Sequence, residues 1–253
     1  MNGAISLGCP TLASEPADAD WTGEITPAVS EDTGMAFGKR ELKPHLSSKL
    51  VKFSRLLLQN APNAEAFVAD RLAYKFGVTE EKAFMIGSGS GQPLGLFTAS
   101  ADGISTSRDL STSNTATAIT FDGLIRNRQN VKAQYRKQSK WVFHRDAMTQ
   151  IMLIKDGMGR YIWNPSATAE MPDMLLGQAV FESEYAPNTF TASKYVGLYG
   201  DFSFYYIADV NAYEVQTLVE KYAEYNQIGL IARKYTDGMP VIEEAFSRVK
   251  LSA

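Results

Sequence analysis

Cysteine and histidine are scarce in this chain of 253 residues. It has one cysteine, Cys9, and two histidines, His45 and His144. A lone cysteine cannot form an intramolecular disulfide, and these three residues are too small a set for a structural zinc site. We therefore expect no metal site and no cofactor.

Long apolar runs are missing as well. No stretch reaches the roughly eighteen apolar residues that a membrane-spanning helix needs. The first residues lack the basic start and apolar centre of a signal peptide. With 45% hydrophobic and 21% charged residues, the chain has an ordinary globular composition, with material for one or two cores.

Positive charge is absent from residues 1–38, which hold six acids, whereas basic residues follow closely from Lys39 on. The net charge of -3 gives no overall attraction to nucleic acid. An acidic arm beside a basic segment suggests contact between copies of the chain, while a solvent-exposed loop beside a solvent-exposed strand is the alternative. The candidate interface residues on the arm are Glu15, Asp18, Asp20, Trp21, Glu24 and Glu31, and the candidate acceptors are Lys39, Arg40, Lys43, Arg126, Arg128 and Arg136.

A glycine-rich segment, residues 87–95, follows a helix-like stretch and contains Gln92-Pro93. Phosphate-binding loops instead run from a strand into a helix. Neither Ser88 nor Ser90 has a glycine two residues away on each side, as a nucleophile elbow requires. The segment therefore predicts a chain reversal with positive φ angles. A small serine hydrolase using Ser88 or Ser90 is the alternative from another functional class.

The periodicity predicts an α+β fold that begins with a strand at 41–54 and a helix at 64–86. Val68, Leu72 and Phe76 share the apolar face of that helix, with Phe67 alongside. A second helix is expected at 123–135. A buried strand at 141–143 leads into a helix that His144 and Asp146 would cap.

The last third of the chain reads as strands that pack back on the long helix. We expect them at 196–199, 204–207, 213–220, 228–233 and 245–251, and Asp237-Gly238 has the composition of a hairpin turn.

Five short segments carry a family resemblance because they occur in one order along the chain. They are Gln92-Pro93-Leu94-Gly95, Trp141-Val142-Phe143-His144, Leu153-Ile154-Lys155-Asp156-Gly157-Met158-Gly159-Arg160-Tyr161, Leu176-Gly177-Gln178-Ala179-Val180 and Tyr199-Gly200-Asp201-Phe202. They resemble segments of the major capsid proteins of tailed phages and prophages, the Hong Kong 97 phage-type capsid family. The third is the most specific, and Ala179 stands where the family usually has proline.

The resemblance implies the Hong Kong 97 phage-type fold. Residues 1–50 would form an extended loop, 51–118 a peripheral domain with the spine helix, 119–201 an axial domain, and 202–253 the return strands of the peripheral domain.

It also implies a structural, non-enzymatic subunit that self-assembles through pentamers and hexamers into an icosahedral virion head. The head would enclose double-stranded DNA by weak, non-specific contact, with portal and scaffolding proteins as further partners and no membrane. Synthesis would take place in the cytoplasm of a bacterial host. An encapsulin-like shell with a protein cargo is the alternative with the same fold.

Two departures from the family pattern carry expectations. The family normally has an N-terminal arm before the extended loop, whereas this chain starts almost directly in the loop, which suggests a truncated chain or a defective prophage copy. Some members join a lysine of the loop to an asparagine of a neighbour. Because no lysine precedes Lys39, we expect no such cross-link at the loop tip.

Overall fold

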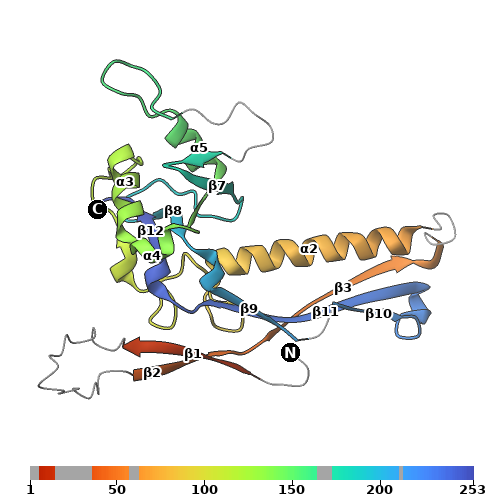
Figure 1. Ribbon diagram of the computed structural model, residues 1–253. Coiled ribbons are helices and arrows are strands. Elements are labelled where there is room, and N and C mark those ends of the chain that lie inside the picture. The colour runs from red at the N-terminus through yellow and green to blue at the C-terminus, as the bar shows by residue number, and fades with distance from the viewer. Residues whose placement is uncertain (1–5, 15–35, 57–62, 164–172, 211–212) are drawn as a thin grey trace, which may run out of the picture.

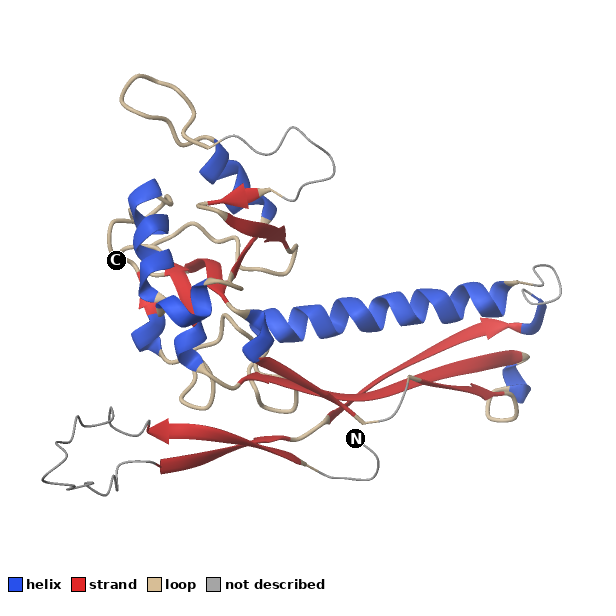
Figure 2. Cartoon of the chain, in the orientation of Figure 1, coloured by secondary structure: helices blue, strands red, loops and turns tan. Residues whose placement is uncertain are grey.

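The computed structural model describes residues 6–14, 36–56, 63–163, 173–210 and 213–253. It has three parts, which Figure 1 shows as a protruding hairpin, an elongated limb and a compact part. The limb and the compact part each contain both helix and strand (Figure 2), so the expected α+β class is confirmed.

The arm hairpin pairs β1 (Leu7–Ser14) with β2 (Ala36–Leu42) in antiparallel register. The next strand, β3 (His45–Ser54), belongs to the limb. The strand predicted at 41–54 is therefore interrupted at Lys43-Pro44. The break is consistent with Pro44, which has no backbone N–H to donate to a strand partner.

The limb is an antiparallel sheet with one long helix on its face. β11 (Gln227–Pro240) is the central strand: it pairs with β3 along one side, and with β10 (Glu214–Leu218) and then β9 (Tyr205–Asp209) along the other. The helix, α2 (Ala64–Ile86), runs alongside these strands in Figure 1.

The predicted helix at 64–86 is confirmed, as is its contact with a returning strand. Leu72 and Phe76 are buried against Phe53 of β3 and Leu230 of β11, as their spacing predicts. Phe67 was expected beside this face, but its side chain is 63% exposed.

The compact part is built on a six-stranded sheet in the order β4-β12-β8-β5-β7-β6. These strands are β4 (Asp109–Leu110), β5 (Lys140–Phe143), β6 (Met174–Leu175), β7 (Gln178–Glu182), β8 (Tyr195–Gly200) and β12 (Phe246–Lys250). The helices are α3 (Phe121–Asn130), α4 (Ala133–Arg136) and α5 (Arg145–Met152), and single 3₁₀ turns span Thr106–Arg108, Phe202–Phe204 and Glu243–Ala245. A further 3₁₀ turn, Ala223–Tyr225, connects β10 to β11 in the limb.

Aromatic packing fills the core of the compact part. Trp141 and Phe143 of β5 are fully buried, and the Trp141 ring lies 4.4 Å from the ring centre of Tyr199 on β8. Burial of side chains of this size provides much of the apolar stabilisation of a domain. The predicted buried strand at 141–143 is thus confirmed.

The helix predicted at 123–135 is wrong in its length, because α3 ends at Asn130 and Val131 is extended. The Asn130 carbonyl accepts a hydrogen bond from Arg108, and its side-chain amide donates to Ser247. These bonds reach residues far away in sequence. Tertiary contacts thus hold the last turn of α3 where local propensity would continue the helix.

The hairpin turn predicted at Asp237-Gly238 is also wrong, because both residues lie inside β11. A Cβ atom on Gly238 would lie 2.7 Å from the Tyr205 hydroxyl and 3.0 Å from the Phe84 ring. The glycine is therefore needed for close packing between α2, β9 and β11, and not for a turn.

Candidate inter-subunit surfaces

The glycine-rich segment reverses the chain, as predicted. Gly89 and Gly91 have φ angles of 78° and 67°. The returning chain donates from Leu96 N to the Phe84 carbonyl and from Phe97 N to the Met85 carbonyl, both at 2.9 Å. These carbonyls belong to the last turn of α2 and would otherwise lack partners. The loop is therefore the C-terminal cap of the long helix.

The two serines of this loop do not form a catalytic arrangement. Ser88 Oγ accepts hydrogen bonds from the Ser90 N–H and the Gln92 amide, and both serines are exposed. His45 and Asp237 line the same cleft of about 510 Å³ as Ser88, but within the described ranges no hydrogen bond joins the three side chains. A nucleophile needs a base within hydrogen-bond reach, so the geometry does not favour the hydrolase alternative.

Asp237 instead fixes the base of the arm hairpin. Its carboxylate accepts from the backbone N–H of Lys43 at 2.6 Å and from that of Gly238 at 2.8 Å. Burial raises the pKa of the Asp237 carboxyl above its ordinary value. The Lys43 bond ties the connection between β2 and β3 to β11.

Further contacts hold the arm hairpin against the limb. The Arg40 guanidinium donates to the carbonyls of Pro240 and Gly103, and burial lowers the pKa of Arg40. Cys9 and Leu42 pack on Ala208 of β9. The base of the hairpin is thus a built contact, with polar and apolar components.

Lys39 of β2 and Lys43, which follows that strand, form ion pairs with Glu41 of β2 at 2.5 and 3.5 Å. The hydrogen bond from Lys39, together with the two positive charges, lowers the pKa of Glu41. Both lysines are exposed, so pairs of this kind contribute little stability and leave the cations open to further partners.

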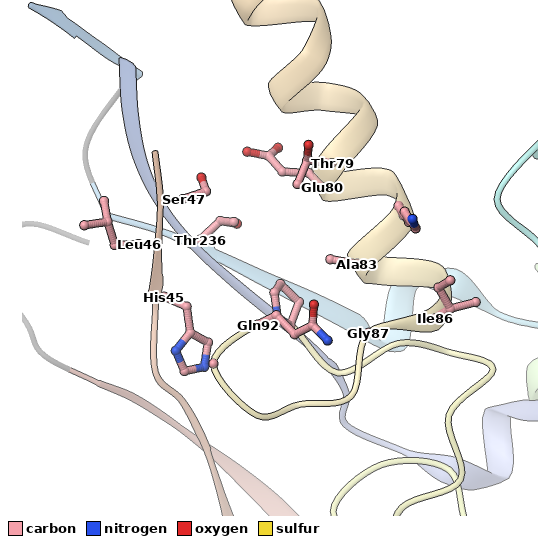
Figure 3. A pocket seen from close by; sticks show the side chains of 13 residues that line it. His45, Leu46, Ser47, Thr79, Glu80, Ala83, Ile86, Gly87, Gln92 and Thr236 are labelled. Carbon is pink, nitrogen blue, oxygen red and sulfur yellow. The ribbon is translucent and has the colours of Figure 1, made fainter. Parts of the chain in front are cut away.

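A cleft separates the end of α2 from β3. Figure 3 shows His45 and Ser47 on the strand side and Thr79, Glu80 and Ala83 on the helix side. This cleft of about 340 Å³ shares Ser47 and Thr79 with a second hollow of about 520 Å³ further along α2. Together they form one groove between the helix and the outer strand of the limb.

An ion pair joins the helix to the sheet at this groove. Lys234 Nζ of β11 lies 2.9 Å from Glu80 of α2 and 3.3 Å from Asp209 of β9. Burial alone would lower the pKa of Lys234, but the hydrogen bond and charge of Glu80, with the charge of Asp209, raise it. The three groups therefore favour the charged lysine.

The turn at 155–161 carries exposed apolar side chains at one end of the compact part. Asp156 accepts from the backbone N–H groups of Met158 and Arg160, each at 2.9 Å, and Gly159 has a φ of 82°. Met158 is 81% exposed and Tyr161 50%. Exposed apolar side chains on an ordered turn mark a contact surface.

The candidate basic residues of α3 and α4 are partly available for contact. Arg126 is exposed, Arg128 is half-buried, and Arg136 donates to Gln129 at 2.5 Å. No carboxylate forms an ion pair with any of the three among the residues that the structure describes. The arm candidates Glu15, Asp18, Asp20, Trp21, Glu24 and Glu31 lie outside the described residues.

Other chemistry is not visible in the described part of the chain. It contains no group of three or more His, Cys, Asp and Glu side chains that could hold a metal ion. None of its helices is long and apolar enough to cross a membrane. His144 caps α5 by accepting from the Asp146 N–H at 3.1 Å, as its position predicts.

A long helix on an elongated sheet, a compact second part, and a hairpin that projects from both define a structural protein suited to contacts with neighbours. The chain belongs to the Phage capsid family, whose model matches residues 8–251. It is a structural capsid subunit and not an enzyme, and the predicted family and fold are confirmed.

Solved capsid structures have the same fold. A chain of the capsid of a native GTA particle, computed with C5 symmetry, is 24% identical, with a TM-score of 0.86, covering 100% of this chain and 87% of that one. The corresponding empty particle gives a TM-score of 0.84 at 24% identity, covering 99% and 86%. A structure from Mycobacterium phage Adephagia gives 0.71 at 15% identity, covering 100% and 87%. No match was found among curated proteins.

Two features of these surfaces were missed by the sequence reasoning. The exposed Met158 lies in the most specific of the five family-like segments, but no feature of that segment indicates a contact surface. The exposed acids Glu182 and Glu184 at the end of β7 carry no motif. Only the strand order, which places β7 next to one end of the sheet, shows that these two acids lie on one side of the compact part.

Proposed function

We propose that copies of this chain assemble through pentamers and hexamers into the closed icosahedral head of a tailed phage or prophage. The observation that carries the proposal is the family match over residues 8–251. The chain also spans 86–87% of the two GTA capsid chains at TM-scores of 0.84 and 0.86. Identical subunits with directional contacts close into rings and shells, in which many weak interfaces add up.

The parts of the chain would then have separate roles. Residues 1–50 would be an extended loop that reaches a neighbour, 51–118 a peripheral domain with α2 as its spine, 119–201 an axial domain at the ring centre, and 202–253 the return strands. Support comes from the projecting arm hairpin and from β9, β10 and β11 beside α2. β12 is an exception to this division, because it lies within 202–253 but pairs with β8 and β4 in the compact part.

The contacts that we propose between copies are electrostatic and apolar. The acidic residues of the arm, with Trp21, would meet basic side chains of a neighbour, among them the exposed Lys39 and Lys43 at the base of the arm hairpin. The Met158 turn would meet its counterparts near the ring centre. An acidic arm that meets a basic surface speeds and orients association.

The shell would enclose double-stranded DNA and would use portal and scaffolding proteins during its assembly in the bacterial cytoplasm. A net charge of -3 fits a container that contacts DNA weakly and without sequence preference. No observation favours a protein cargo over DNA.

Light scattering with negative-stain microscopy tests the proposal. The full chain is measured over a range of concentrations and salt. Rings or shells whose mass is a multiple of five or six subunits are expected. A monomer at every concentration, both alone and with scaffolding protein, would overturn the proposal.

A further inference from the structure

The compact part has one side with a cluster of cations and another side with three exposed carboxylates. In Figure 1, α3 and α4 lie on the left of its sheet, while β7 and α5 lie toward the right. The strand order agrees, because α3 packs on β12 and β4 at one end of the sheet and β7 lies next to the other end. The two sides therefore face away from each other in one subunit.

The first side, which we call the basic edge, carries Arg126, Arg128, Arg136 and Lys137. Asp122, one helical turn before Arg126 on α3, is acidic. Lys132 already forms an ion pair with Glu244 at 2.6 Å. Arg126 is exposed and has no ion pair with a described residue. Ile125, the preceding residue, is 39% exposed and presents an apolar side chain to a possible partner surface. An exposed arginine next to an apolar side chain is typical of protein interfaces.

The second side, which we call the acidic edge, carries Glu182, Glu184 and Asp146. Glu184 lies 3.4 Å from Arg145 and 3.5 Å from His144, and Asp146 lies 3.2 Å from His144. Glu182 is exposed and has no ion pair among the described residues. Phe181, the preceding residue of β7, points to the opposite face of the sheet, where it is 46% exposed and Lys140 Nζ lies 5.1 Å from its ring centre.

We propose that the basic edge of one subunit binds the acidic edge of the next, with Arg126 meeting Glu182. This inference rests on the proposed self-assembly and names the contact that would close the ring. Because the two edges are different surfaces on opposite sides, the interface is heterologous, and such contacts form rings when the rotation closes. Arg126 and Glu182 are both exposed and form no ion pair with a described residue, so each is open to a partner on a neighbouring copy.

The acidic edge favours a protein partner over DNA for the basic edge. A surface evolved for phosphates would need no matching acids elsewhere on the same subunit, whereas head-to-tail contact requires both. Four cations on a short helical segment are also few for a sequence-independent DNA contact at physiological salt. Binding of DNA is therefore the rival outcome in the test.

Charge reversal tests this contact in the full chain. Arg126→Glu and Glu182→Arg each place like charges together, while Arg126→Glu with Glu182→Arg restores the attraction in reverse. As a control, Glu182→Arg is combined with Lys221→Glu, an exposed residue on the limb, which restores the net charge but not the contact. Assembled mass is measured by sedimentation, and folding of each variant by circular dichroism.

Each single reversal should raise the concentration needed for assembly about tenfold or more, since like charges at an interface oppose association. The double reversal should recover assembly, and the control pair should not. Shells that form normally with Arg126→Glu would overturn the inference, whether or not they retain less DNA. A double variant no better than the single ones would do the same. A wild-type chain that stays monomeric would overturn the proposed function, and this contact with it.

Discussion

Lys234 of β11 lies 2.9 Å from Glu80 of α2, with its side chain 19% and that of Glu80 16% exposed. The pair joins the central strand of the limb to the helix that covers it. Asp209 is 3.3 Å from the same ammonium group. Removing the lysine would thus leave two nearby acids without their shared cation.

Lys234→Met should destabilise the chain by about 2–4 kcal/mol, because breaking a buried ion pair leaves an uncompensated charge. The measurement is urea unfolding at neutral pH. Lys49→Met on the exposed surface of β3 is the control, with a change within about 0.5 kcal/mol. Adding Glu80→Gln to Lys234→Met should restore part of the loss, and no recovery would speak against the pair.

The pH dependence of this pair has a definite sign. The pKa of Lys234 is raised in the folded state, so its stabilisation is present below the ordinary lysine value of 10.5 and disappears as the pH rises through the folded pKa.

Asp237 predicts a different pH dependence at the base of the arm hairpin. Burial raises the pKa of this carboxyl in the folded state above 3.8. The folded chain then binds this proton more tightly, and its stability falls as the pH rises from about 3.8 through the folded pKa. In Asp237→Asn this contribution is absent. The difference in unfolding free energy, wild type minus variant, should therefore decrease between pH 3.5 and 7, and an increase would contradict the prediction.

Two glycines give opposite predictions for the same substitution. A Cβ atom on Gly95 would lie 2.5 Å from Gly87 N and 2.6 Å from the Met85 carbonyl, both of them backbone atoms that cannot move aside cheaply. Gly95→Ala should therefore destabilise the chain by about 3 kcal/mol or more. Around Gly77, within α2, a Cβ atom would meet nothing within 4 Å. Gly77→Ala should stabilise by about 0.5–1 kcal/mol. Thermal unfolding of both variants decides, and equal shifts would contradict the account.

A substitution at Met158 is expected to affect assembly but not folding. Since this side chain is 81% exposed, Met158→Asp should change the unfolding free energy by less than about 0.5 kcal/mol. Its effect should instead appear as a higher concentration for ring formation, because several copies of the new charge would gather at one centre. Met158→Leu is the apolar control and should assemble as the wild type does.

The sequence predicted most where local pattern and tertiary contact agree. The period of Val68, Leu72 and Phe76 predicted the long helix, and the alternating glycines predicted the chain reversal after it. A prediction was wrong where residues typical of one local structure have a different role in the folded chain. Asp237-Gly238 has the composition of a turn, yet the aspartate binds Lys43 N and the glycine admits Tyr205.

The interface candidates show a second limit. The sequence shows which residues are cations and acids, but not which of them already form hydrogen bonds or ion pairs within the subunit. Arg40 bonds to backbone carbonyls of Gly103 and Pro240, whereas Arg126 has no described ion-pair partner. Glu182 and Glu184 became interface candidates because of the strand order, which no short motif in a single sequence reveals.

The pairing of β3 with β11 also determines when the limb sheet can form during synthesis of the chain. Ser54 pairs with Gln227, and His45 with Thr236, so the limb sheet joins an early segment to one near the C-terminus. On a ribosome, the apolar side chains of α2 and β3 cannot pack on β11 until residues 227–236 have been synthesised. An incomplete chain would therefore lack the rigid limb that carries the arm hairpin. A chain that ends before residue 227 would therefore lack the central strand of the limb.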